Sequence, residues 1–404
     1  MPKAPPYVRA RRFVRSLPGK ANLLRHWGWL HGLSDYPGDA IHVSSPRLER
    51  AGRYTRVVAN VDGQPLWFES EDALLVPEPE AWGSALVAAA ALSGRPLVME
   101  TPLCPVWRSN VERAVGLMHR WGKTAEVPGA LNLLRERATP RRTAGDVREG
   151  TTASAICFTG GVDSFHALLQ HREHLIALVF VHGFDITLAD QARVAAWEPY
   201  LRAVAAALGV KAIVVRTNLR EHRTLRRLDW VMLHGAALAS VGHTLAGTVN
   251  ELLIAASFNV HNMAPWGSHP ELDPSWSSAH LRIRHTGEAL WRREKLAQIA
   301  DDPLVQAHLR VCWANLTSDL NCGRCEKCIR TLLSLAVQGR LEAFAHSFPQ
   351  TPPLAERIRG IEPLRGFYVP VYEAFLGKGL SDELEAAIRS RLPTSTQSTA
   401  HADE

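Results

Sequence analysis

Residues 153–164 read ASAICFTGGVDS, in which an apolar strand candidate over 153–158 runs directly into a Gly-Gly turn. A helix is predicted over Asp163–Arg172. The alternation then continues, with strands predicted at 175–181, 211–216 and 251–257 and helices at 189–208 and 229–245. Continuous apolar strands between long helices are typical of a parallel sheet with helices on both faces. We therefore expect an α/β fold for residues 153–340, with ligands beyond the C-terminal ends of the strands.

The turn Thr159-Gly160-Gly161-Val162-Asp163-Ser164 has the features of a phosphate-binding loop. Paired glycines let backbone amides point toward an anion, and the N-terminus of the following helix adds partial positive charge. The hydroxyls of Thr159 and Ser164 can donate to phosphate oxygens, and Asp163 can cap the helix or hold Mg²⁺. A plain strand-to-helix turn is the alternative. The Lys of a Gly-Lys-Ser/Thr P-loop is missing, so hydrolysis at the γ-phosphate is not expected.

A cysteine-rich segment follows later, where residues 312–328 read CWANLTSDLNCGRCEKC. Four thiolates at this spacing satisfy a tetrahedral zinc ion and leave no open position, so we expect a structural zinc knuckle. An iron–sulfur cluster and metal-free reduced cysteines are the alternatives, and the ferredoxin run with its trailing Pro is absent. The predicted ligands are Cys312, Cys322, Cys325 and Cys328.

The remaining segments are less informative. Residues 1–140 are predicted to form an α+β domain of unknown role, with strands near 53–60 and 64–69 and helices near 82–92 and 110–121. A polar linker is expected at 139–152 and a helical segment at 341–392. Residues 393–404 have almost no apolar content, so we expect a disordered tail.

The composition of the 404 residues limits the class of protein. With 46% hydrophobic and 21% charged residues, it is typical of a globular protein and excludes a collagen-like, wholly disordered or coiled-coil chain. No apolar run reaches the roughly 18 residues of a membrane span. We therefore expect a cytoplasmic enzyme without a membrane partner; a homodimer is compatible with the sequence. The net charge is +6, and the acid-free basic segment Lys3–Arg25 either contacts nucleic acid or protein or is a solvated terminus.

The loop and the cysteines together resemble the PP-loop (N-type) ATP pyrophosphatase superfamily and, within it, the zinc-containing 7-cyano-7-deazaguanine synthase family, over about 153–335. Thr159 stands where the family's Ser-Gly-Gly-x-Asp-Ser loop has its first Ser. Val181-His182-Gly183-Phe184-Asp185 resembles an aromatic-Gly turn of the family, and Arg292-Arg293-Glu294-Lys295 its basic segment before a helix. Residues 259–276 occupy the place of its substrate loop.

This resemblance implies an adenine nucleotide alpha-hydrolase-like fold and an ATP-dependent carbon–nitrogen ligase. Such an enzyme activates a carboxylate or carbonyl as an adenylate, releases pyrophosphate, and adds nitrogen from ammonia or an amine to give an amide or nitrile. The implied cofactors are ATP, Mg²⁺ and Zn²⁺. The acceptor would be a small molecule, deazapurine-like in the family, or a carboxylate on a macromolecule.

Roles can then be assigned to single residues. Thr159–Ser164 would bind pyrophosphate, with Asp163 and Ser164 in catalysis, and Arg293 and Lys295 would neutralise charge on the leaving group. His182 and Gly183 would contact the nucleotide, and His182 could also move a proton. The candidate substrate contacts are Asn259, Trp266, His269 and Glu271, with Trp266 or Trp276 as a stacking surface. Each assignment has a structural alternative: a solvated basic helix start, a buried histidine, or a loop that holds itself together.

Two other functions remain open. A PP-loop sulfurtransferase that modifies a nucleic-acid base would need a reactive thiol near the adenylate, and Cys157, two residues before the loop, is the candidate. A buried strand cysteine is the alternative for Cys157. A nucleotide-regulated nucleic-acid-binding adaptor would use the basic segment and the knuckle to bind phosphate. The intact Thr159–Ser164 loop favours an enzyme.

Overall fold

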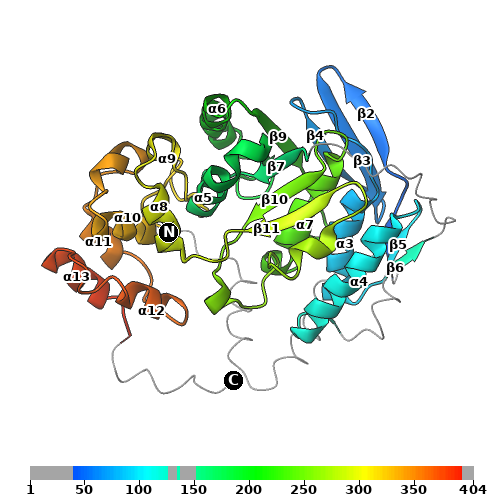
Figure 1. Ribbon diagram of the computed structural model, residues 1–404. Helices are drawn as coiled ribbons and strands as arrows, with labels where there is room; N and C mark the ends of the chain where they lie inside the picture. The colour runs from blue at the N-terminus through cyan, green and yellow to red at the C-terminus, as the bar shows by residue number, and fades with distance from the viewer. Residues whose placement is uncertain (1–39, 126–133, 137–151, 394–404) are drawn as a thin grey trace.

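The computed structural model describes residues 40–125, 134–136 and 152–393 as an α/β fold built on one large sheet (Figure 1). The strand order is β11-β10-β7-β8-β9-β4-β3-β1-β5-β6, and β2 pairs with β3 off this path. The strands are β1 (Ile41–Val43), β2 (Arg47–Ala51), β3 (Tyr54–Val61), β4 (Gln64–Ser70), β5 (Leu97–Met99), β6 (Leu134–Glu136), β7 (Ser154–Cys157), β8 (Leu175–His182), β9 (Lys211–Thr217), β10 (Glu251–Ala255) and β11 (Arg282–Thr286). The predicted α/β class with a mostly parallel, helix-flanked sheet is confirmed.

The parallel half of the sheet has the order β11-β10-β7-β8-β9, with every neighbouring pair parallel. The chain moves outward from β7 through β8 to β9 and then returns to add β10 on the other side of β7. The winding direction therefore reverses between β7 and β10. In doubly wound sheets ligands bind at such a switch point, beyond the C-terminal strand ends.

Two hydrophobic cores lie on opposite faces of the sheet, because successive side chains of a strand point in opposite directions. Ala155 and Cys157 belong to one core, and Ile156 and Phe158 to the other. Helices α3, α4 and α7 pack on the first core, and α5, α6 and α8–α13 on the second (Figure 1). The helices are α3 (Glu80–Ser93), α4 (Pro105–Arg120), α5 (Val162–His171), α6 (Gln191–Ala207), α7 (Trp230–Thr244), α8 (Arg292–Ile299), α9 (Pro303–His308), α10 (Glu326–Val337), α11 (Leu354–Arg359), α12 (Tyr368–Glu373) and α13 (Asp382–Arg389).

The N-terminal strands extend the same sheet. Strand β4 pairs antiparallel with β9, with Phe68 opposite Thr217 and Glu69 opposite Arg216. The hairpin of β3 and β4 turns through Asp62 and Gly63, whose φ angles of 51° and 76° match a two-residue type I′ turn. The elements predicted near 53–60, 64–69, 82–92 and 110–121 are present as β3, β4, α3 and α4. Their junction with β9 was not foreseen.

Some predicted segments lie wholly or mostly outside the described residues: the basic segment Lys3–Arg25, the linker at 139–152 and the tail at 393–404. Within the described ranges, no helix is both long and apolar enough to cross a membrane. The segment 341–392 holds helices α11, α12 and α13, which pack on the second core beside α10.

Candidate functional site: the loop at the switch point and the cysteine knuckle

The loop Thr159–Ser164 joins β7 to α5 at the switch point. Gly160 has a φ of +74°, and a Cβ there would collide with the indole ring of Trp197, so the fold itself requires glycine. Gly161 is extended (φ −77°, ψ 165°), and a Cβ there would meet nothing closer than the Thr159 hydroxyl at 3.5 Å. The first turn of α5 follows directly, and Ser164 Oγ donates to the Gly161 carbonyl at 3.0 Å. The loop therefore lies at a helix N-terminus, and a methyl group at Gly161 would make only ordinary contacts there.

Asp163 is held by two cations of α8. Arg292 donates to one carboxylate oxygen, and Lys295 Nζ lies 3.2 Å from the other. Lys295 also donates to the carbonyl of Ala256, just after β10, at 2.7 Å and is almost fully buried. Burial alone would raise the pKa of Asp163, but the charges of Arg292 and Lys295 outweigh it and lower the pKa. Lys295 therefore joins α5, through the ionised carboxylate of Asp163, to the segment that follows β10.

Of the two predicted cations Arg293 and Lys295, only Lys295 contacts Asp163. Arg293 is exposed, and its guanidinium lies 5.4 Å from the ring centre of Trp291. The arginine that contacts Asp163 is Arg292, which the sequence analysis quoted without giving it a role. A helix places residues three apart on one face, so the spacing of Arg292 and Lys295 was the signal that could have identified it.

His182 ends β8 and is buried, and its Nε2 lies 2.9 Å from the Thr187 carbonyl. Burial lowers the pKa of His182, so the ring is neutral near pH 7. Gly183 has a φ of +116°, and a side chain there would strike the Thr217 carbonyl. This turn is therefore tightly packed, and the ring nitrogen already has a backbone partner.

Two of the predicted substrate contacts follow the end of β10. Asn259 is 3% exposed, and neither its Oδ1 nor its Nδ2 has a hydrogen-bond partner among the described residues. Trp266 is half-buried and packs edge-on against Phe258, with ring centres 5.0 Å apart, and against His234 at 6.0 Å. An unsatisfied buried amide that directly follows Phe258 in the chain is a candidate contact for a planar polar ligand.

The other predicted contacts pack elsewhere. The ring of His269 lies edge-on to Trp121, at the end of α4, with centres 4.9 Å apart, and its Nδ1 accepts from the Glu271 amide. Trp276 is fully buried in the first core, so its ring cannot stack on a ligand. Asp273, also buried, accepts from Ser268 and pairs with His285 at 2.7 Å. Residues 269–276 therefore form a structural segment between α4 and α7.

Two further cations lie close to the loop. The backbone N–H of Arg310 donates to the Gly160 carbonyl at 2.8 Å, and its side chain is buried. Lys327, in the first turn of α10, is near enough to Arg292 and Asp163 that their charges act on it; burial, then Arg292, lower the pKa of Lys327. With Arg292 and Lys295, four cations therefore lie close to the loop, together with the carboxylates of Asp163 and Asp185.

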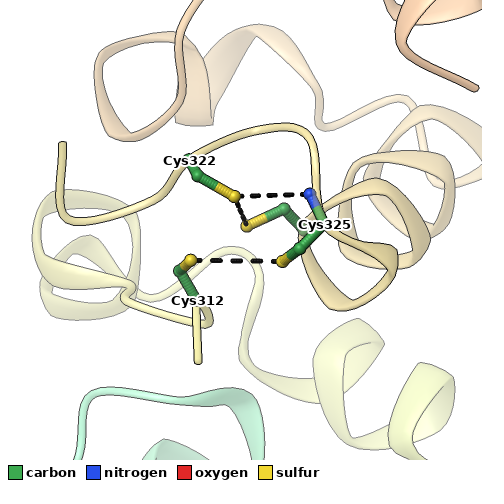
Figure 2. Close-up of side chains that lie close together, drawn as sticks. Cys312, Cys322 and Cys325 are labelled. Carbon is green, nitrogen blue, oxygen red and sulfur yellow. Dashed lines mark hydrogen bonds between the residues drawn. The ribbon is translucent and has the colours of Figure 1, made fainter. Parts of the chain in front are cut away.

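The four cysteines converge on one point. Their sulfur atoms all lie within 4.8 Å of one another, and all four residues are buried and free of disulfides. The sulfurs of Cys312 and Cys325 are 4.0 Å apart, and those of Cys322 and Cys328 3.9 Å (Figure 2). Four sulfurs about 2.3 Å from a tetrahedral zinc ion are about 3.8 Å apart. The cluster can therefore hold a single metal ion such as zinc.

The backbone around the knuckle suits thiolate ligands. Amide groups point at two of the sulfurs. Asn315 N is 3.3 Å from the sulfur of Cys312. Figure 2 shows the other contact, in which Cys325 N is 3.3 Å from the sulfur of Cys322. Hydrogen bonds among the cysteines lower the pKa of Cys312 and raise that of Cys328. An iron–sulfur cluster distributes its cysteines over several irons, which would need a wider arrangement.

No protein-family model, curated protein or solved structure matches the chain. The functional assignment therefore depends on the geometry at the switch point. There the structure brings together the Thr159–Ser164 loop, Lys295 and the segment that begins with Ala256, and the knuckle lies alongside through Arg310.

Proposed function

We propose that the chain is an ATP-dependent ligase of the PP-loop type, in which the loop Thr159–Ser164 binds the phosphates of ATP. The observation that carries this proposal is the position of the loop. It lies at the switch point of a parallel sheet, with a helix N-terminus behind it and Lys295 fixed between Asp163 and the end of β10. Helix N-termini at such points are suited to phosphate.

The proposed reaction has two steps. A carboxylate or carbonyl oxygen of the acceptor attacks the α-phosphorus of ATP, the bond to the β-phosphate oxygen breaks, and pyrophosphate leaves. Ammonia or an amine then attacks the activated carbon, AMP leaves with the bridging oxygen, and the nitrogen loses a proton, so that a carboxylate acceptor gives an amide. With ammonia, the oxygen of the primary amide can attack a second ATP and release pyrophosphate, and loss of AMP and of both protons of the nitrogen then gives a nitrile. Mg²⁺ bound to the phosphates would supply further neutralising charge.

Several described residues take part in the proposed chemistry. Arg292 and Lys295 keep Asp163 ionised and place positive charge where pyrophosphate would leave, which lowers the barrier electrostatically. Asn259 offers a donor and an acceptor side by side, and Trp266 offers an aromatic surface. This pair fits a planar heteroaromatic acceptor, and the deazapurine-like class remains part of the proposal.

Nitrogen transfer is favoured over sulfur transfer because no reactive thiol lies at the loop within the described residues. Cys157 is buried in the first core, and burial raises the pKa of its thiol to about 12. It stays protonated at neutral pH and is a poor nucleophile. The knuckle cysteines are the proposed zinc ligands, and Cys104 is buried beside α4.

The identity of the nucleotide products tests the proposal. The full chain is incubated with Mg-ATP, ammonium and a set of heteroaromatic carboxylates, and the nucleotides are separated by chromatography. The proposal expects AMP and pyrophosphate with an acceptor, and a large loss of product in Gly161→Ala, whose added methyl would occupy the anion space. ADP and phosphate as the products would contradict it.

A further inference from the structure

Arg310 is buried against the loop without a counter-charge bonded to it. Its side chain is 2% exposed, and its guanidinium carbon lies 5.7 Å from the ring centre of Trp197, the ring that packs against Gly160. Nε and Nη2 have no hydrogen-bond partner among the described residues. The backbone of Arg310 therefore bonds to the loop, its side chain lies beside the ring that packs on Gly160, and two of its three guanidinium nitrogens have no hydrogen-bond partner among the described residues.

The other buried arginines of the described chain show how unusual this is. Arg95 pairs with Asp62 at 3.1 Å, and Arg193 pairs with Asp190 and donates to two carbonyls. Arg357 donates to the carbonyls of the knuckle turn and of Pro349. A buried guanidinium without partners is unfavourable, so a fold retains one chiefly where something else completes it.

We propose that Arg310 is an anion ligand of this site, whose guanidinium binds phosphate oxygens held at the loop Thr159–Ser164. Guanidinium groups bind phosphate oxygens in a bidentate manner, and aromatic contact with Trp197 orients the planar group. This inference rests on the proposed phosphate site and extends it, because the ligand comes from the segment before the knuckle rather than from the sheet.

The knuckle fixes the position of this arginine. Cys312 follows Arg310 by two residues, and Asn321, just before Cys322, accepts from the amides of Val311 and Cys312 at 2.7 and 3.2 Å. The Asn321 amide also donates to the Leu309 carbonyl at 2.8 Å. The segment 309–312 is thus bound on both sides of Arg310, and the knuckle holds the guanidinium next to the loop.

Pyrophosphate binding by the full chain tests the proposal. Affinity is measured by calorimetry, and thermal unfolding is recorded with and without pyrophosphate, for the wild type, Arg310→Gln and the control Arg95→Gln. Loss of a charge-assisted contact predicts about 10- to 100-fold weaker binding in Arg310→Gln. Without ligand its midpoint should be unchanged or higher, because a buried unpaired charge is removed. Arg95→Gln should lower the midpoint and keep the affinity, since Arg95 lies toward the far end of the sheet.

The outcomes separate this inference from the proposed reaction. Wild-type pyrophosphate affinity in Arg310→Gln overturns the inference even if AMP is formed, and a wild type that binds no pyrophosphate overturns it as well. If pyrophosphate binding depends on Arg310 but ATP is converted to ADP, the result supports the inference about Arg310 and contradicts the proposed ligase reaction. If Arg310→Gln does not fold, Arg310→Lys replaces it. A bidentate contact then predicts at least about fivefold weaker binding, and unchanged affinity overturns the proposal.

Discussion

Two regions of the sheet differ in how their buried polar groups are paired. Around the hairpin of β3 and β4, Asp62 accepts from His42, Thr224 and Arg95, and Glu69 pairs with Arg56 and Arg216. At the C-terminal ends of the parallel strands, Arg310 and Asn259 are buried, and Nε and Nη2 of Arg310 and both polar atoms of the Asn259 amide have no hydrogen-bond partner among the described residues.

This contrast separates structural from functional polar groups. A satisfied buried network holds a fold together, whereas unsatisfied groups gathered at one edge indicate that a ligand is needed to complete them. Lys295 is an intermediate case: it is buried and fully engaged, yet it links the loop to the end of β10.

Loss of the knuckle should have the largest effect. We expect about one zinc per chain by elemental analysis, and Cys325→Ser or chelation should lower the free energy of unfolding by several kcal/mol, because structural zinc sites contribute about 10–16 kcal/mol of apparent binding energy. Cys157→Ala, which changes a buried cysteine outside the knuckle, should keep the zinc content. If the protein freed of metal unfolds at the same midpoint as the untreated protein, the result would contradict the proposed metal centre.

Asp163→Asn should come next. The variant leaves Arg292 and buried Lys295 without their anion, and removal of one partner of a buried pair costs about 3–5 kcal/mol. The pKa of Asp163 is lowered in the fold, so its stabilisation is present above the unfolded value of 3.8 and is lost as the pH falls below it. Denaturant titrations at pH 7 and pH 3 measure both effects, and a difference as large at pH 3 as at pH 7 would contradict the ion-pair account.

The sequence was sufficient for the parallel half because its signals are local. Apolar strands, the Gly-Gly turn and the cysteine spacing each predict a local structure, and β7, α5 and α6 appear where expected. The junction of β4 with β9 was missed because it joins residues about 150 apart, and no local pattern encodes such a partner. Arg310 was missed for the same reason: its role comes from tertiary burial beside Gly160.

His243 is a buried polar residue that has a hydrogen-bond partner, so it tests the structural group of the comparison. It is fully buried in α7, its Nε2 lies 2.9 Å from the Trp276 carbonyl, and burial lowers the pKa of the ring to about 4. Because the folded pKa is below the unfolded value of 6.5, the unfolded chain binds a proton first as the pH falls. Stability should therefore decrease between pH 6.5 and about 4, by on the order of 3 kcal/mol. His243→Gln should flatten this part of the pH profile measured by denaturant unfolding, and an unchanged slope would contradict the assignment.

The two glycines of the loop, Gly160 and Gly161, should give the smallest changes in stability. Their variants should nevertheless differ clearly in how they respond to pyrophosphate. Gly160→Ala forces a side chain into left-handed backbone against Trp197, which costs about 2 kcal/mol from the backbone alone, so the protein should be less stable with or without ligand. Gly161→Ala meets only ordinary contacts in the protein, the nearest at 3.5 Å, so its stability should stay within about 0.5 kcal/mol of wild type. Its methyl group would lie among the hydroxyls of Thr159 and Ser164 and the backbone carbonyl of Arg310, at the loop where the anion is proposed to bind. Thermal unfolding with and without pyrophosphate therefore separates the two variants: Gly160→Ala lowers the midpoint, whereas Gly161→Ala keeps the midpoint and loses the increase caused by pyrophosphate. A ligand-induced increase of wild-type size in Gly161→Ala would show that the space between these three residues is not the anion site, and the unsatisfied edge of the sheet would then need another ligand.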